Sequence, residues 1–374
     1  MIVTAHAPVD EVDHVLAELR AAHCAAPLTL IILFVSAAGD LRALTTQAEQ
    51  NLPGTPIIGC TTAGEIGPTG YLDGHVVALG LPASHFIART ELIGNLTELD
   101  ANNAAERVAR ARVDLETQEP KWRSSVAFML VDGLSLCEDQ LVAALRPGLG
   151  STQLFGGSAG DGLNFAATSV FAGTEIAQDA AVIALIRSRC PIEVFKSDHF
   201  EPTETKMVVT DADPERRIVR EINAAPAARE YARMVGKDPD QLSPFIFAAH
   251  PVVVKVGGQH HVRAIQKVEP NGDLTFFSAI DEGLVLTVAK PVNMVDHLDQ
   301  TLSRFTNGHA PEMFIGCDCI LRRLEAEQYQ ANRHVSDVLS KHNVIGFNTY
   351  GEQWQSVHVN QTFTGAAIFP PDDE

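Results

Sequence analysis

Apolar positions along the chain form short runs that recur three times in the same order. Each repeat begins with a strand-like run, passes through a segment of helical composition and ends with a second apolar run. The first runs are residues 30–35, 126–131 and 313–317, and the second runs are residues 76–81, 180–186 and 364–369. Self-similarity on this scale indicates one α/β unit used three times.

A glycine-bearing segment lies between the two runs of each repeat. Each segment has an apolar pair, a glycine, a small or hydroxyl-bearing stretch, and a second glycine followed by an acid; the segments are residues 57–65, 154–161 and 344–352. Glycine permits positive φ angles and close backbone approach. We therefore expect three turns at strand ends that share one site. The alternative is that the glycines only allow sharp turns where a strand leaves its sheet.

The first two repeats are evenly spaced. Residues 28–35 predict a buried strand and residues 40–51 a helix, while in the second repeat residues 138–145 predict a helix ended by Pro147-Gly148. The distance from each strand to its glycine suits a right-handed βαβ crossover. The third repeat is looser, and one long polar helix is expected at residues 321–341.

Residues 195–302 break the repeat pattern. Residues 206–222 predict a hairpin, and Asn271-Gly272 is a strong turn signal between two further strands. The predicted fold class is therefore α/β, with repeated strand-helix-strand units forming mixed sheets and an α+β insertion. We expect one domain at residues 1–195, with two repeat units, and a second at residues 196–374, with the inserted module followed by the third unit.

Charge and composition narrow the function classes. The chain of 374 residues has a formal net charge of −19, which argues against binding to nucleic acid or to an anionic membrane. The start lacks the basic region of a signal peptide, and no apolar run approaches the roughly 20 residues that span a bilayer. We therefore expect a cytoplasmic protein. Six cysteines without CxxC spacing argue against a disulfide framework or a structural zinc site.

The glycine segments suggest the chemistry of a small-ligand site. Exposed backbone N–H groups suit a carboxylate, hydroxyl groups add hydrogen bonds, and the acids suit an ammonium group. An amino acid carries both charges and fits this chemistry. The candidate ligand-binding residues are Gly59, Cys60, Thr61, Thr62, Glu65, Asp132, Gly157, Ser158, Asp161, Cys317, Arg322, Thr349, Tyr350, Glu352 and Asn360. Walker and Rossmann nucleotide-binding patterns are absent in the required context.

Some of these candidates also have structural interpretations. Arg322 follows a strand and suits a carboxylate or a haem propionate, although a solvated surface arginine is the alternative. Asp132 either pairs with the ligand or caps the turn that follows it. Cys317 and Cys319 face the same side of a strand, where buried core cysteines are more common than reactive ones.

The motifs resemble the FIST family, which comprises sensory proteins with linked N- and C-terminal FIST domains. The resemblance covers residues 29–369 and is carried by residues 59–66, 154–162, 317–322, 346–352 and 358–362. It implies a bacterial input module that binds a small ligand, with amino acids proposed for the family. Because no F-box, kinase or cyclase segment is attached, it also implies output through a separate protein such as a histidine kinase or a cyclic-di-GMP enzyme.

One bacterial branch of this family is regarded as haem-binding nitric-oxide sensors. His358 lies in a family motif and is the candidate iron ligand if haem b is bound, whereas a hydrogen-bonded structural histidine is the alternative. No CxxCH motif is present, which excludes covalent haem attachment.

A function from another class is a thiol-dependent enzyme. It would use Cys317 or Cys60 with His358 and Glu352. No catalytic motif supports it, and we expect a non-catalytic sensor. The sequence leaves open whether the protein forms a homodimer.

Overall fold

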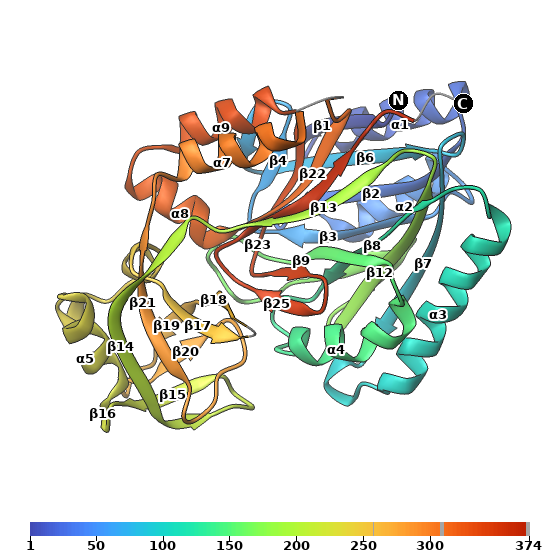
Figure 1. Ribbon diagram of the computed structural model, residues 1–374. Coiled ribbons are helices and arrows are strands. Elements are labelled where there is room, and N and C mark those ends of the chain that lie inside the picture. Colours follow the sequence, from blue (N-terminus) through green and yellow to red (C-terminus); the bar gives the residue numbers. More distant parts are fainter. Residues whose placement is uncertain (257, 307–309, 372–374) are drawn as a thin grey trace.

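Three units with the same order of elements form the core of the protein. The computed structural model describes residues 1–256, 258–306 and 310–371. Each unit runs strand, helix, strand, helix, strand, hairpin, strand, with two helices in place of the second helix in unit three, which confirms the repeated α/β architecture (Figure 1).

The first two units follow each other without interruption. Unit one contains β1 (Val3–Pro8), α1 (Val12–Ala25), β2 (Leu28–Ser36), α2 (Leu41–Asn51), β3 (Ile57–Thr62), β4 (Glu65–Gly67), β5 (Gly70–Leu72) and β6 (His75–Pro82). Unit two contains β7 (Phe86–Gly94), α3 (Ala101–Gln118), β8 (Ser124–Val131), α4 (Glu138–Leu149), β9 (Gln153–Ser158), β10 (Val170–Ala172), β11 (Glu175–Ala177) and β12 (Ala180–Ser188).

The third unit is split by the inserted module. Its elements are β13 (Ile192–Ser197), α7 (Met294–Ser303), β22 (Met313–Cys319), α8 (Ile320–Gln328), α9 (Asn332–Lys341), β23 (Val344–Thr349), β24 (Glu352–Trp354), β25 (Val357–Val359) and β26 (Phe363–Ile368). The sequence indicated only the part after the module, because β13 alone carries no recognisable repeat signal.

The hairpin of each unit pairs with the sheet of another unit. The three core sheets have the orders β1-β6-β2-β3-β10-β11, β7-β12-β8-β9-β24-β25 and β13-β26-β22-β23-β4-β5. The pairings within the sheets correspond, with one parallel pair, β2–β3, β8–β9 or β22–β23, in each. The hairpin exchange closes a ring, because unit one completes the sheet of unit three, unit three that of unit two, and unit two that of unit one.

Apolar side chains from the inner faces of all three sheets form the centre of the core. Phe34 of β2 stacks on Phe347 of β23 at 4.7 Å between ring centroids, and it meets Phe128 of β8 at 6.3 Å. The outer face of each sheet is covered by the helices of its own unit, α1 and α2, α3 and α4, or α7 and α9. Burial on both faces explains why the strands read as continuous apolar runs.

The first glycine of each segment lies inside a strand. Each pairs with a residue of the neighbouring parallel strand, and an added Cβ atom would lie 2.3 Å from the carbonyl oxygen of Leu33 at Gly59, 2.0 Å from that of Met129 at Gly156, and 1.8 Å from that of Gly316 at Gly346. Close approach of two backbones therefore explains the repeated glycine.

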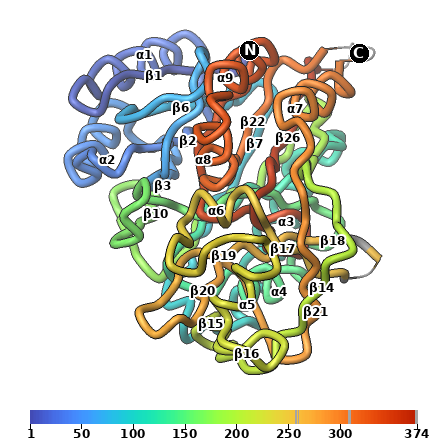
Figure 2. Tube along the Cα trace, turned by 90° about the vertical axis from the view of Figure 1, so that its left-hand side faces the viewer, coloured from blue at the N-terminus to red at the C-terminus, as the bar shows by residue number. Residues whose placement is uncertain are grey.

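Two antiparallel strands connect the inserted module to the core. It contains β14 (Phe200–Asp213), β15 (Ile218–Ile222), β16 (Ala225–Pro226), α5 (Ala227–Val235), α6 (Pro244–Ala249), β17 (Val252–Val256), β18 (Gln259–Arg263), β19 (Ile265–Val268), β20 (Leu274–Phe276) and β21 (Val285–Pro291). β14 leaves the core and β21 returns to it, with Phe200 opposite Pro291. Figure 2 shows the module at one end of the molecule.

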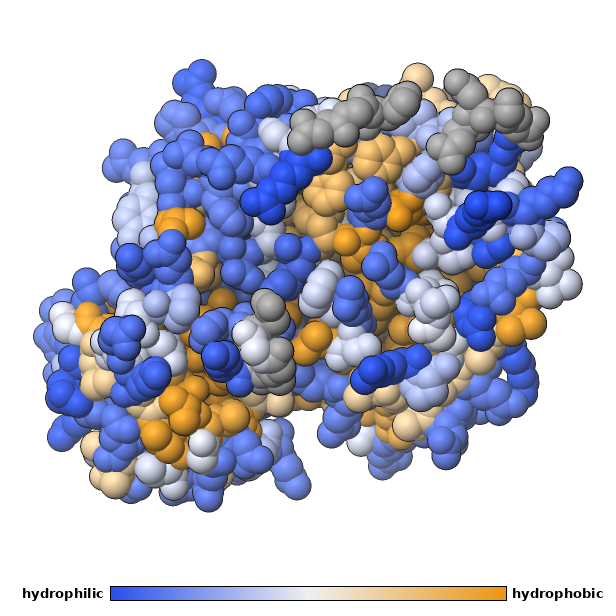
Figure 3. All heavy atoms as spheres, in the orientation of Figure 1, coloured by the Kyte–Doolittle hydropathy of each residue, from blue (hydrophilic) through white to orange (hydrophobic). Residues whose placement is uncertain are grey.

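The surface of the module is partly apolar. Figure 3 shows apolar residues gathered on the face of the module that is in view. Val208 and Val285, which pair between β14 and β21, are 38% and 48% exposed. Within the part of the chain that the structure describes, no helix has the length and apolar character needed to cross a membrane.

Two sequence expectations about helices were wrong. The single helix expected at residues 321–341 is two helices, α8 and α9, separated at Gln330, which has a positive φ of 55°. Helix α4 does not end at Pro147-Gly148 but continues to Leu149 and stops at Gly150. Pro147 lies in the last turn, where it removes the hydrogen bond that a backbone N–H would give to the Ala143 carbonyl, and the helix ends two residues later.

Candidate functional site

The three glycine segments meet at the centre of the ring. We call this region, residues 61–65, 158–161 and 348–352, the junction. Its backbones bond in a cycle: Ala63 N–H donates to Asn348, Tyr350 N–H to Ser158, and Gly160 N–H to Thr61, over 3.0–3.1 Å. The segments therefore converge, as the sequence led us to expect. They converge by contacting one another, because an added Cβ at Gly160 would lie 2.8 Å from the Ala63 nitrogen.

Two buried carboxyls occupy equivalent places beside the junction. The hydroxyl of Thr62 donates to Glu65, and that of Thr349 donates to Glu352. Glu352 also accepts from the hydroxyl of Thr362 at 2.6 Å. Burial raises the pKa of Glu65 to about 7 and that of Glu352 to about 8. Both carboxyls are thus held by protein donors and are mostly neutral or close to half-ionised at neutral pH.

The acid of the second segment has a different role. By register, the position of Glu65 and Glu352 is taken in unit two by Val170. Asp161 lies earlier, and it accepts backbone N–H groups of Phe165, Ala166 and Ala167 at 2.8–2.9 Å. It therefore holds a loop that units one and three lack.

Asp132 and Tyr350 hold the neighbouring loops. Asp132 accepts from Leu134 N–H at 3.1 Å and from Asp179 N–H at 2.6 Å, which is the capping role that the sequence left open. The hydroxyl of Tyr350 donates to Asp161, and its ring lies 4.6 Å from that of Phe165.

A pocket of about 550 Å³ opens between these loops and the module. Gly133, Leu134 and Phe165 line it from the core, and Gln266 and Phe277 line it from the module. Asp132, Asp161 and Tyr350 thus shape one wall of this pocket through the loops that they hold.

Two candidate cysteines pack in the central core. Cys60 and Cys317 are buried there, and by register Cys317 takes the place that Phe34 has in unit one. Burial raises the pKa of both thiols well above the ordinary range. The nearby Glu65 raises the pKa of Cys60 further, and Glu352 does the same for Cys317. Because the thiolate is the reactive form, this environment opposes thiol chemistry. Gly59 approaches the backbone of Leu33, whereas an added Cβ at Gly157 would meet the side chains of Thr349 and Phe347.

His358 belongs to a fully buried polar cluster with Gln353, Asn360 and Ser158. The amide nitrogen of Gln353 lies 3.0 Å from the Ser158 hydroxyl and 3.3 Å from Nδ1 of His358, while the Asn360 amide lies 3.5 Å from Nε2. Burial lowers the pKa of His358. Both ring nitrogens face side-chain amides, an arrangement that does not fit an axial haem ligand. Whether the protein binds haem at His358 is not tested by this geometry and is left to experiment.

The same cluster has polar atoms without partners. Among the described residues, the side-chain oxygens of Gln353, Asn360 and Gln361 are buried and accept no hydrogen bond. Nε and Nη1 of Arg263, on strand β18 of the module, are also buried without an acceptor. β18 lies against β25, and Arg263 is close enough to lower the pKa of His358. Unpaired buried groups of this kind are costly, and the guanidinium is the costliest.

Arg322 is buried in a chain of charged and polar groups. Its Nε donates to Asp318 at 2.6 Å and its Nη1 donates to Nδ1 of His199 at 2.8 Å. Nε2 of His199 lies 2.9 and 3.0 Å from the two oxygens of Glu325, and Asp318 also accepts from Tyr71. Arg322 therefore does not face the junction, and its carboxylate partner is Asp318.

His199, Glu325 and Arg263 were missed by the sequence argument. His199 and Arg263 lie in the module region that breaks the repeat. Glu325 lies four residues after Leu321 on a helix that reads as polar and exposed, yet its side chain is 3% exposed. A buried histidine–glutamate pair over 126 residues of sequence leaves no local pattern.

The comparisons with known proteins cover most of the chain. The FIST N domain matches residues 29–225 and the FIST C domain matches residues 227–355, so the two meet at β16 of the module. The uncharacterized protein MJ1623 of Methanocaldococcus jannaschii is 21% identical over 378 residues, covering 91% of this chain and 73% of that protein. Since the FIST N match alone spans more than half of the chain, this protein belongs to the FIST family of sensory domains.

Proposed function

We propose that this protein is a cytoplasmic sensor that binds a small carboxylate-bearing molecule, such as an amino acid, between the core and the module. The observation that carries the proposal is Arg263, whose buried Nε and Nη1 have no acceptor among the described residues. Burial lowers the pKa of Arg263, while Asp139 raises it. A carboxylate at either edge of the guanidinium would accept one of these N–H groups in a charge-assisted hydrogen bond.

The surrounding groups supply the rest of an amino-acid site. The amide oxygens of Gln353, Asn360 and Gln361 have no donor among the described residues, and as acceptors they suit an ammonium group. Gln361 also donates to the carbonyl of Ala248 in α6 at 2.9 Å, so this cluster already joins core and module. The candidate residues Ser158 and Asn360 belong to the same cluster.

The position of the site suggests how binding is passed on. Arg217 of the module donates to Glu138 of the core at 2.7 Å, and its side chain is 3% exposed. A ligand that pairs with Arg263 adds to this interface and favours one arrangement of module and core. We infer output by contact with a separate signalling protein, of the histidine kinase or cyclic-di-GMP enzyme kind that the family resemblance implies.

Thermal unfolding in the presence of each proteinogenic amino acid and its decarboxylated amine tests the proposal. We expect amino acids, and not the amines, to raise the melting temperature. Arg263→Gln should weaken the best amino acid by about tenfold or more. The matched control is Arg220→Gln, which removes an exposed module arginine paired with Asp211 and Asp213. If no amino acid stabilises the protein, or if Arg263→Gln binds like the wild type, the proposal is wrong.

A further inference from the structure

A second pocket, of about 610 Å³, lies where the module joins the core. It is lined by Pro291 and Asn293 at the end of β21 and the start of α7, by Glu325 and Tyr329 of α8 and its end, and by His334 of α9. It shares no lining residue with the cluster around Arg263.

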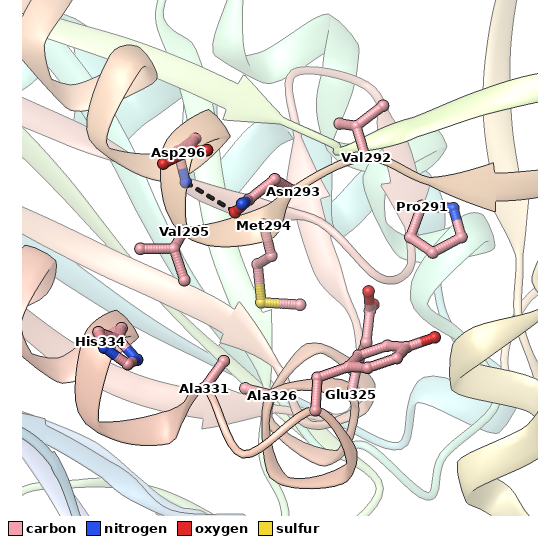
Figure 4. Close-up of a pocket in the computed structure, with 11 residues that line it drawn as sticks. Pro291, Val292, Asn293, Met294, Val295, Asp296, Glu325, Ala326, Ala331 and His334 are labelled. Carbon is pink, nitrogen blue, oxygen red and sulfur yellow. Dashed lines mark hydrogen bonds between the residues drawn. The ribbon is translucent and has the colours of Figure 1, made fainter.

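One buried carboxyl points into this pocket. Figure 4 shows the carboxyl group of Glu325 extending toward the space between Met294 and Pro291. The other walls near it, Val292, Met294 and Ala326, are apolar. A polar group at the back of an apolar pocket fixes the orientation of a ligand and selects its chemistry.

The position of this carboxyl is fixed from behind. Arg322 has only N–H donors, so Nδ1 of His199 must accept, and the imidazole proton therefore lies on Nε2. Nε2–H then donates to Glu325 at 2.9–3.0 Å. This bond holds the carboxyl in place and leaves its remaining lone pairs to accept from a molecule in the pocket.

The charges around the pocket favour a cation. Its described lining residues include the acids Asp296 and Glu325 but no lysine or arginine, and His334 is the one basic side chain among them. Glu325, Ala326 and Tyr329 also lie at the C-terminal end of α8, where the helix dipole favours positive charge.

We propose that this pocket binds a small organic amine, whose ammonium group pairs with Glu325 and whose apolar part packs against Met294 and Pro291. The site is separate from the carboxylate site proposed above. Because the pocket lies between the β21–α7 connection and α8, an amine there joins the strand that returns from the module to the core. Module position would thus respond to a second ligand.

Amine binding should release a proton. Burial raises the pKa of Glu325 to about 8, with Arg322 lowering it and Asp318 raising it. His199, which immediately precedes β14, donates to the Glu325 carboxyl, and Asp296 of α7, Tyr329 at the end of α8 and His334 of α9 are the other titratable groups that line the pocket. At pH 7 the carboxyl is mostly protonated, so pairing with an ammonium ion sends its proton to the buffer.

Isothermal titration calorimetry at pH 7 with benzylamine, benzyl alcohol and benzoate tests the proposal. We expect benzylamine alone to bind at millimolar concentration, with a binding enthalpy that varies with the ionisation enthalpy of the buffer because the carboxyl gives up its proton on binding. This measurement needs no variant. Failure of benzylamine to bind, binding of benzyl alcohol at equal affinity, or a buffer-independent enthalpy would each overturn the proposal.

Three variants test whether benzylamine binds at Glu325. Glu325→Gln keeps an acceptor for His199 but should weaken benzylamine by about tenfold or more, and should abolish proton release. The control Glu18→Gln removes an exposed acid of α1 that does not line the pocket, and should change affinity by less than about threefold. Arg263→Gln should leave benzylamine binding intact, which separates this site from the carboxylate site. Equal benzylamine affinity in Glu325→Gln and wild type would contradict the assignment.

Discussion

Glu65 and Glu352 occupy the same register position in two units of one chain, and each is bonded by the threonine three residues before it. Both side chains are fully buried, and burial is the largest cause of their raised pKa values, about 7 and about 8. In unit two the position is held by Val170. This buried position therefore accepts either a neutral carboxyl or an apolar side chain. The two carboxyls are compatible with the folded state mainly in their protonated form.

The first prediction concerns the pH dependence of stability. Because these carboxyls have folded-state pKa values above the ordinary 4.5, their stabilising effect is complete below about pH 4.5 and is lost as pH rises toward 8. Urea unfolding should show the free energy of unfolding falling over this range. Glu352→Gln should remove a few kcal/mol of the fall, since one pKa unit corresponds to about 1.4 kcal/mol. An exposed control, Glu18→Gln, should leave the fall unchanged; an equally steep profile in Glu352→Gln would contradict us.

The second prediction concerns the buried pair of Asp318 and Arg322. Arg322→Met leaves Asp318 buried without its cation, and we expect a loss of about 3–5 kcal/mol in the free energy of unfolding. Arg89→Met breaks a pair with Asp114 that is about half exposed and should cost less than about 1 kcal/mol. Similar losses for both variants would show that burial does not set the strength of the first pair.

The third prediction tests the repeated glycine. Gly346→Ala places a Cβ atom against the Gly316 carbonyl oxygen, and we expect a loss of about 1–3 kcal/mol or more. Gly94→Ala is the matched control, because an added Cβ there meets nothing within 4 Å, and its effect should stay within about 0.5 kcal/mol. Chemical denaturation of both variants gives the comparison, and a mild Gly346→Ala would mean that the strands can separate locally.

The fourth prediction concerns thiol reactivity. Cys24 is exposed and the other five cysteines are buried. A thiol reagent should therefore modify one cysteine quickly in the native protein and six after unfolding, and Cys24→Ser should remove the fast reaction. Rapid modification of Cys317 in the native state would revive the thiol-enzyme alternative.

The fifth prediction addresses haem. Both ring nitrogens of His358 face amides, so titration with haemin should give no Soret band that depends on this residue. His358→Ala and wild type should have the same spectrum. A sharp Soret band in the wild type that is lost in His358→Ala would establish haem ligation and overturn this expectation.

The sequence predicted the repeat well, because both parts of the signal are local. The strand runs and glycine segments repeat within short windows, and they led to three units and to converging segments. The hairpin exchange was not predicted, since β4, β10 and β24 are three-residue strands that each pair on one side with a strand of another unit. Helix α8 was likewise expected to be exposed, because its sequence contains charged residues such as Arg322 and Glu325. Their buried partner His199 lies 123 and 126 residues away along the chain, so no local pattern in the sequence indicates it.

The candidate site was predicted only in part. Recurrence pointed to residues at the junction, and the structure brings Thr61, Ser158 and Tyr350 together there. Recurrence cannot identify residues such as Arg263, which lies in the module and has no counterpart in the repeats. Whether the N–H groups of an arginine have acceptors depends on which groups surround it in the folded chain, and the sequence does not show this.

The exchange of hairpins has a consequence for synthesis on the ribosome. The sheet of unit one lacks its last two strands until residue 177 has emerged, and the sheet of unit two waits for residue 359. A nascent chain therefore carries unpaired strand edges through almost all of translation, and such edges invite aggregation. Chaperone dependence during expression, and poor yield of either half made alone, would follow from a ring that only the finished polypeptide can close.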